Sequence, residues 1–166
     1  MEKLHFRLSY MALPLAILVI AGVTSAVFYG RLPQSTGWQF SGGVPVSQVS
    51  RGAFLGWALG LQIMLCVVAF IIVFVIVSAG RRMQLTASPL NRTLIGIMGN
   101  IVAMPQLIIY YAVLDIFLNN IYGKSLPPLW VFGIAVLFIG ALVIFSVFIT
   151  AFLKSRAEKI QEKTGS

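Results

Sequence analysis

Apolar residues gather in four long blocks separated by shorter polar connections. The blocks cover about Tyr10–Tyr29, Phe54–Ala79, Leu94–Phe117 and Leu129–Leu153. Each is long enough to cross a hydrocarbon core about 30 Å thick, which takes roughly 20 helical residues. Because backbone hydrogen bonds in lipid must be satisfied within the segment, each block is predicted to be a helix. The pattern therefore predicts an all-α integral membrane protein, a four-transmembrane-helix bundle that forms one membrane domain over residues 1–166.

The composition supports a membrane environment. Hydrophobic residues make up 59% of the 166 residues and charged residues 10%, whereas soluble domains have about 45–50% and 25%. A small domain keeps a large fraction of its surface in contact with the surroundings, so it cannot hide this much apolar area from water. A soluble enzyme and a soluble nucleic-acid-binding domain are excluded, and the lipid bilayer is the expected environment.

The twelve basic residues lie mostly on one side of the predicted membrane. Nine of them flank the termini side, namely Lys3, Arg7, Arg81, Arg82, Arg92, Lys154, Arg156, Lys159 and Lys163. The other three are Arg31, Arg51 and Lys124. The positive-inside rule then places both termini in the cytoplasm and makes the chain a multi-pass protein. The net charge of +8 forms no contiguous basic surface, so no nucleic-acid partner is expected.

The two ends of the chain carry further expectations. Lys3 and Arg7 followed by Met11–Gly22 also fit a signal peptide that ends near Ala26. The apolar run continues past Ala26, which favours a retained helix. The tail 154–166 is predicted to extend the fourth helix into the cytoplasm.

The sequence offers no catalytic or metal-binding pattern. His5 and Cys66 are the single histidine and the single cysteine, and Cys66 reads as a small buried hydrophobe. Paired carboxylates, a Ser/His/Asp set and a phosphate-binding glycine loop are all missing from the sequence. We therefore expect no catalytic residues, no metal site, no cofactor and no enzyme activity.

The connection 31–53 is the longest polar stretch outside the helices and is predicted to lie at the outer face. Its glycines and prolines favour turns, and its aromatic residues favour the headgroup layer. Two interpretations stay open: a loop that caps the bundle, and a recognition surface for a molecule that arrives from outside. The candidate recognition residues are Leu32, Pro33, Trp38, Phe40, Gly43 and Pro45.

These residues resemble a known motif. Leu32-Pro33, Gln39-Phe40 and the Gly43-x-Pro45 pair, before a helix that opens near Gly52, are similar to the Leu-Pro…His-Phe…Gly-x-Pro loop of SdpI-like bacterial immunity proteins and related uncharacterised membrane proteins. Gln39 stands where that family usually has histidine, and Val46 where it often has aspartate. The resemblance implies a prokaryotic plasma membrane, an extracytoplasmic peptide as ligand, and immunity or signalling as the role.

The second helix begins with a ridge of small residues. Gly52, Gly56 and Gly60 repeat every four residues and lie on one helix face, which lets another backbone approach closely. Gly22, Ala26 and Gly30 offer a matching line on the first helix. We expect the two helices to pack together there, with homo-oligomerisation or docking of a membrane protein partner as the alternative.

Polar residues inside the apolar blocks are the remaining candidates. Asp115 is expected near the outer end of the third helix, in a salt bridge with Arg31, Arg51 or Lys124 or as an anchor at the interface. The other intramembrane polar candidates are Asn100, Gln106 and Gln62, with Pro105 expected to kink the third helix. Interhelical hydrogen bonds are the expected role, and a polar ligand cavity is the alternative.

Three functions are compatible with these features. The first is SdpI-like binding, immunity or signalling at the outer face. The second is an accessory or assembly subunit of a larger membrane complex, and the third is a small transporter that uses Asp115 or the region of Asn100 and Gln106.

Overall fold

The computed structural model describes residues 5–41, 44–83 and 88–164. Four helical segments are long and apolar enough to cross a membrane, which confirms the predicted helical class. The elements are, in chain order, η1 (Leu8–Met11), α1 (Ala12–Tyr29), β1 (Ser35–Ser41), β2 (Val44–Ser50), α2 (Arg51–Arg82), α3 (Pro89–Asn100), α4 (Ala103–Tyr122) and α5 (Leu129–Thr164).

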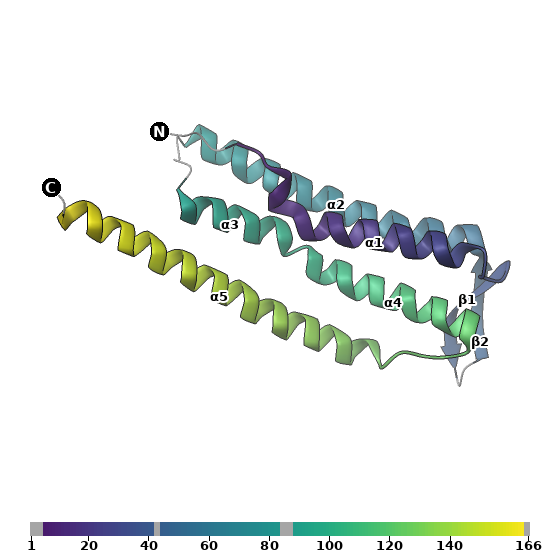
Figure 1. Ribbon diagram of the computed structural model, residues 1–166. Coiled ribbons are helices and arrows are strands. Elements are labelled where there is room, and N and C mark those ends of the chain that lie inside the picture. Colours follow the sequence, from purple (N-terminus) through teal and green to yellow (C-terminus); the bar gives the residue numbers. More distant parts are fainter. Residues whose placement is uncertain (1–4, 42–43, 84–87, 165–166) are drawn as a thin grey trace.

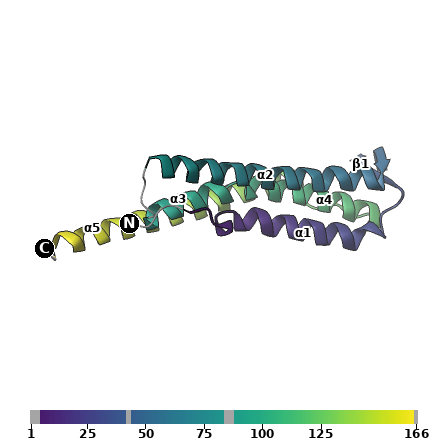
Figure 2. The ribbon, with the colours of Figure 1, turned by 90° about the horizontal axis from the view of Figure 1, so that it is seen from above.

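The helices run roughly side by side, with a β-hairpin across one end of the bundle (Figure 1). The N-terminal and C-terminal parts of the chain both lie at the opposite end (Figure 1). We call these the hairpin end and the termini end. Helix α5 lies against α3 and α4, and its C-terminal part extends beyond the other helices (Figure 2).

The hairpin corrects the expectation of an irregular loop over 31–53. β1 and β2 pair antiparallel from Ser35–Ser50 to Ser41–Val44, with irregular register near Gln39. Much of the hairpin surface is exposed, so the alternation of apolar and polar residues that marks a half-buried strand is weak here. Helix α2 then begins at Arg51, with the Ser50 hydroxyl accepting from the Ala53 amide as an N-cap.

The third apolar block is two helices rather than one. α3 ends at Asn100 and α4 begins at Ala103, two residues before the proline that was expected to kink the helix. Pro105 has no N–H to donate to the Ile101 carbonyl, and the Met104 amide takes that carbonyl at 3.1 Å in a tighter turn. Pro105 thus lies in the first turn of α4, where its missing donor costs little.

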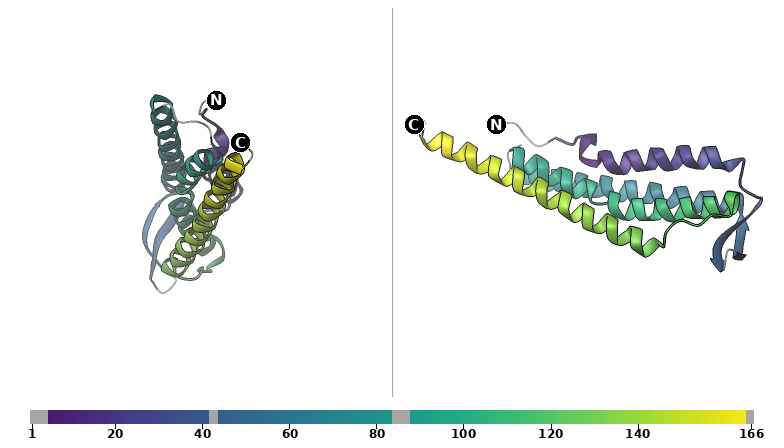
Figure 3. Two further views of the ribbon diagram at one scale, coloured as in Figure 1. Left: turned by 90° about the vertical axis from the view of Figure 1, so that its left-hand side faces the viewer. Right: turned by 60° about the horizontal axis from the view of Figure 1, so that its bottom comes forward.

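Three clusters of buried side chains hold the bundle together along its length. At the termini end, Tyr10 packs on Val73, Val77 and Ile95. The middle cluster is Met11, Ala69 and Val102. The cluster at the hairpin end is Leu32, Phe54, Leu55 and Phe117. Most of the buried members come from η1, α2, α3 and α4, and α1 adds the partly buried Leu15 and Phe28. Helix α5 runs along the outside (Figure 3).

Candidate functional sites

The hairpin is fixed to the bundle by a buried apolar contact. Leu32, just before β1, is 4% exposed and lies in the cluster with Phe54, Leu55 and Phe117. A side chain this buried cannot meet an incoming molecule, so the expectation that Leu32 belongs to a recognition surface is wrong. Its role is to seat the start of the hairpin on α2 and α4.

A second anchor is the side-chain amide of Asn120 on α4. It accepts a hydrogen bond from the Gly37 amide at 2.8 Å and donates to the Gly37 carbonyl at 2.7 Å. The amide therefore bonds both backbone groups of Gly37, as a neighbouring strand would. Gly37 is required for a further reason: a Cβ there would lie 2.7 Å from the Pro45 Cβ and 3.1 Å from the Phe40 ring.

The exposed residues of the hairpin are uncharged, and apolar side chains lie among them beside exposed glutamines and serines. Trp38 is 44% exposed, and Val44 and Val46 are about two-thirds exposed. Pro33 and Pro45 are also exposed, while Phe40 is half-buried over Gly37. Of the predicted recognition residues, Pro33, Trp38 and Pro45 thus stay accessible, and Gly43 lies outside the described residues.

Substitution of Asn120 by leucine, which is similar in size, should free the hairpin from α4. The change removes both bonds to Gly37 while keeping the volume of the side chain. We expect amide hydrogen exchange of 35–41 to accelerate by about tenfold or more, in line with the loss of two bonds of roughly 1 kcal/mol each. Exchange in α2 and α5 should stay unchanged, and uniform acceleration throughout the chain would contradict a local anchor.

Two of the three basic residues at the hairpin end, Arg31 and Arg51, contact tyrosines rather than Asp115. The Arg31 guanidinium donates to the Tyr122 hydroxyl at 3.1 Å. The Arg51 guanidinium lies 4.4 Å from the centroid of the Tyr29 ring and donates to the Tyr29 carbonyl. Both cations are therefore held against aromatic side chains at the edge of the bundle.

Asp115 has a different role from the ion pair expected. Its Oδ1 accepts from the Leu126 amide at 2.6 Å and from the Asn119 side chain at 3.4 Å. The carboxylate therefore ties α4 to the connection that leads into α5. Arg31, Arg51 and Lys124 make no contact with it in the described part of the chain, because the first two are committed to tyrosines. This arrangement gives no particular support to Asp115 as a transport residue.

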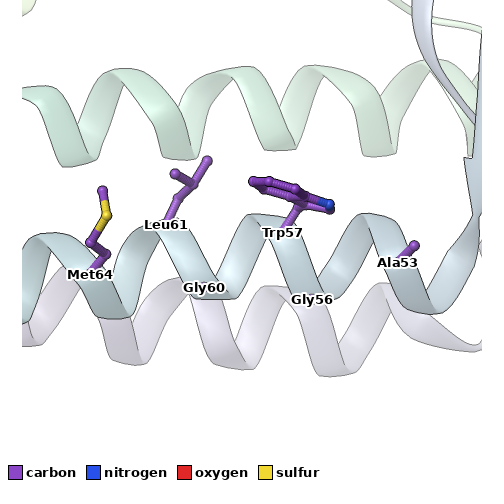
Figure 4. Close-up of a pocket in the computed structure, with 6 residues that line it drawn as sticks. All are labelled: Ala53, Gly56, Trp57, Gly60, Leu61 and Met64. Carbon is purple, nitrogen blue, oxygen red and sulfur yellow. The ribbon is translucent and has the colours of Figure 1, made fainter.

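The glycine ridge of α2 faces away from the bundle. Gly52, Gly56 and Gly60 are exposed, and a Cβ added to any of them meets nothing within 4 Å among the described residues. A shallow cavity of about 420 Å³ lies on this face, lined also by Trp57 and Met64. Figure 4 shows bare backbone at Gly56 and Gly60, beside the projecting side chains of Trp57, Leu61 and Met64.

The expectation that this ridge packs on α1 is wrong. Gly22 and Gly30 on α1 also meet nothing within 4 Å in the described part of the chain. The two helices do pack, but α2 turns Ala58, Gln62 and Cys66 toward the bundle. Those buried positions lie on a different side of α2 from Gly56 and Gly60, which leaves the ridge open.

Two glutamines form the polar centre of the bundle. Gln62 of α2 is 1% exposed and Gln106 of α4 is fully buried. Each side-chain amide donates to the other residue's backbone carbonyl, at 3.2 and 3.3 Å. The Gln106 amide also reaches the Pro14 carbonyl at 3.2 Å, and the Cys66 thiol donates to that same carbonyl. These bonds tie α1, α2 and α4 together, as the interhelical interpretation expected.

Asn100 acts elsewhere, at the start of α1. Its Oδ1 accepts from the Leu13 amide at 2.9 Å, and its Nδ2 donates to the Tyr10 carbonyl at 3.1 Å. The first turn of α1 has no side-chain cap of its own, so Asn100 satisfies one of its free donors. The structure therefore separates Asn100 from Gln106, and the two do not form one polar cavity.

Sequence reasoning missed Asn120, Gly99 and Phe117. Asn120 follows the third apolar block, next to Asn119, and this pair of polar residues near a helix end was the signal that could have identified it. Gly99 lies against Tyr10 and Val73, yet it does not belong to a four-residue glycine repeat. Phe117 is one of twelve phenylalanines, and only the fold shows that it is fully buried.

These features define a mostly helical protein with four candidate transmembrane helices and a small hairpin at one end. Comparison with known proteins found no family model that matches this chain, and no curated protein or solved structure with significant similarity to it.

Proposed function

We propose that this chain is a non-catalytic protein of a prokaryotic plasma membrane whose hairpin binds an extracytoplasmic peptide, in the manner suggested by its resemblance to SdpI-like proteins. The observation that carries the proposal is the preorganised hairpin. Leu32 and Asn120 hold its base, while Trp38, Val44 and Val46 present an uncharged face outward. A surface ordered before binding loses less entropy when a ligand docks.

The orientation is part of this proposal and rests on the excess of basic residues at the termini end. A cysteine introduced at the exposed Ser41 position should react with a membrane-impermeant maleimide added to intact cells. A cysteine at the exposed Arg156 position should react only after the cells are opened. Cys66 is buried and gives the background in the unmodified chain. The reverse pattern would place the hairpin in the cytoplasm and contradict the proposal.

Peptide recognition is tested by selecting a library of displayed peptides of about ten residues on the protein in lipid nanodiscs. Peptides that bind through the hairpin should lose about tenfold or more in affinity when Trp38 is replaced by alanine, because aromatic anchors dominate small interfaces. Trp130→Ala is the matched control, since Trp130 is 68% exposed and lies in the first turn of α5. Phe40 is a poorer choice because its ring covers Gly37. Equal loss in both variants, or no selected peptide, would reject the hairpin as the site.

The open glycine ridge favours a second function, that of an accessory or assembly subunit. Bare backbone at Gly56 and Gly60 lets a transmembrane helix of another copy or another protein approach closely, which is the main source of helix association in lipid. This role does not conflict with peptide binding, because the ridge faces lipid and the hairpin lies at the end of the bundle.

The subunit role is tested by native mass spectrometry after extraction from the protein's own membrane in a mild detergent. Gly56→Leu should remove the associated membrane chain, and Gly22→Leu should retain it. A Cβ at either position meets nothing within 4 Å among the described residues, which makes the two variants a matched pair. A wild-type protein that is only monomeric, or an association that survives Gly56→Leu, would count against the ridge as the interface.

A further inference from the structure

A large apolar cavity lies between α5 and the rest of the bundle. Its volume is about 640 Å³, within the range of roughly 300–1,000 Å³ that holds small ligands. One wall includes Ile97 of α3 with Ala103 and Leu107 of α4. The other wall includes Val136, Ile139 and Val143 of α5. We call this cavity the α5 slot.

Helix α5 packs on the bundle without being buried by it. None of the residues in its most apolar 18-residue window is buried among the described residues, against 22–28% for the other three spans. Gly140 contributes to the shape of the slot, because the side chain of Met104 occupies the place that a Cβ would take. Met104 thus bridges α4 and α5 at this point, and the slot beside the contact leaves room for an apolar group between the two walls.

The lining of the slot selects an apolar occupant. Asn100 and Thr93 are the polar side chains in the lining. The Asn100 amide is already bonded to Leu13, Tyr10 and Gly96, and Thr93 lies near the termini end of α3. The middle of the slot therefore offers no free polar group to a ligand, and hydrocarbon is the matching chemistry.

The polar part of the occupant is indicated by charge. Val136, Val143 and Val147 line the slot at positions that repeat along one face of α5. Lys154 follows Val147 by seven residues, two helical turns further toward the termini end on the same face. Lys154 and Arg156 are exposed there, where a cation attracts an anionic lipid headgroup.

We propose that the α5 slot binds one acyl chain of an anionic phospholipid, whose headgroup lies beside Lys154 in the leaflet at the termini end. The lipid supplies the apolar layer that α5 lacks and links it to α3 and α4. This site is separate from the hairpin and from the glycine ridge, so it does not depend on either proposed function.

The test is native mass spectrometry of the full chain supplied with phosphatidylglycerol or phosphatidylcholine of identical acyl chains. One phosphatidylglycerol per chain should survive activation that strips other lipids, at about fivefold higher occupancy than phosphatidylcholine. Val143→Trp fills the slot and should lower this occupancy about tenfold. Leu142→Trp is the matched control, because Leu142 is similarly exposed but does not line the slot. Lys154→Gln should remove the headgroup preference while leaving the chain folded.

Several results would overturn the proposal. Equal retention of the two lipids by the wild-type chain would show that the headgroup is not selected. Unchanged retention in Val143→Trp, with thermal unfolding like that of Leu142→Trp, would place the lipid elsewhere. A retained mass that corresponds to a free fatty acid would replace the phospholipid with a different occupant and reject this assignment.

Discussion

Gly99→Ala is expected to destabilise the bundle by about 2–3 kcal/mol, a large effect for the addition of one methyl group. A Cβ at Gly99 would lie 2.6 Å from Cγ2 of Val73 and would collide with the backbone carbonyl of Tyr10. That carbonyl cannot easily move, because the Asn100 amide holds it at 3.1 Å. The chain must therefore separate η1, α2 and α3 to accept the methyl group. The measurement is the shift of the unfolding midpoint in mixed micelles, followed by circular dichroism.

Gly56→Ala is the control for this prediction. A methyl group there enters open space, and alanine favours a helix over glycine by roughly 0.5–1 kcal/mol. Stability should therefore stay unchanged or rise slightly. Equal destabilisation by the two variants would mean that the Gly99 contact does not limit the packing of α3 against η1 and α2.

The contrast between Gly99 and Gly56 shows that the spacing of glycines in a sequence does not determine which of them is packed against another helix. A repeat every four residues predicts correctly that Gly52, Gly56 and Gly60 share one helix face. It does not say whether that face meets the chain's own helices or the lipid. The choice depends on which side of α2 carries the larger set of buried contacts, and those include Phe54, Ala58 and Gln62. Rotation of a helix is a property of the whole bundle.

Features that depend on the bilayer, or on the chemistry of a single residue type such as proline, were easier to predict. Length and hydropathy define the four spans because lipid accepts few alternatives to a helix. Pro105 breaks the third block because it lacks an N–H. The side-chain N–H groups of Gln62 and Gln106 find acceptors across helices because hydrocarbon offers none. Each prediction followed from a constraint that acts on a short stretch of chain.

The hairpin and the partners of Asp115 could not be predicted in the same way. β1 is held by Asn120, which is distant in sequence by 83 residues from Gly37. Asp115 accepts a hydrogen bond from the backbone amide of Leu126. Every residue except proline has such an amide, so the sequence does not indicate which one an acidic side chain will bind. Counting basic residues at the hairpin end therefore suggested an ion pair where the fold uses a backbone hydrogen bond.

Phe117→Ala should affect the bundle and the hairpin together. Phe117 is fully buried, stacked on Phe28 at 5.2 Å and edge-on to Phe54 at 5.7 Å between ring centroids. It also lies in the cluster that seats Leu32. Truncation of a buried phenylalanine costs about 3–5 kcal/mol through lost contacts and the cavity left behind, so we expect a loss of about 3 kcal/mol in the unfolding free energy.

Phe117→Ala shows whether Phe117 stabilises both the bundle and the hairpin or the bundle alone. If Phe117 supports the hairpin through Leu32, hydrogen exchange in 35–41 and in the hairpin-end halves of α1 and α2 should rise together. Phe145→Ala is the control, since Phe145 is 64% exposed on α5 and faces surroundings as apolar as itself. It should change the unfolding free energy by less than about 0.5 kcal/mol. Loss of bundle stability with an unaffected hairpin would show that Asn120 alone holds the hairpin in place, and peptide binding would then depend on Asn120 and not on the aromatic cluster beneath it.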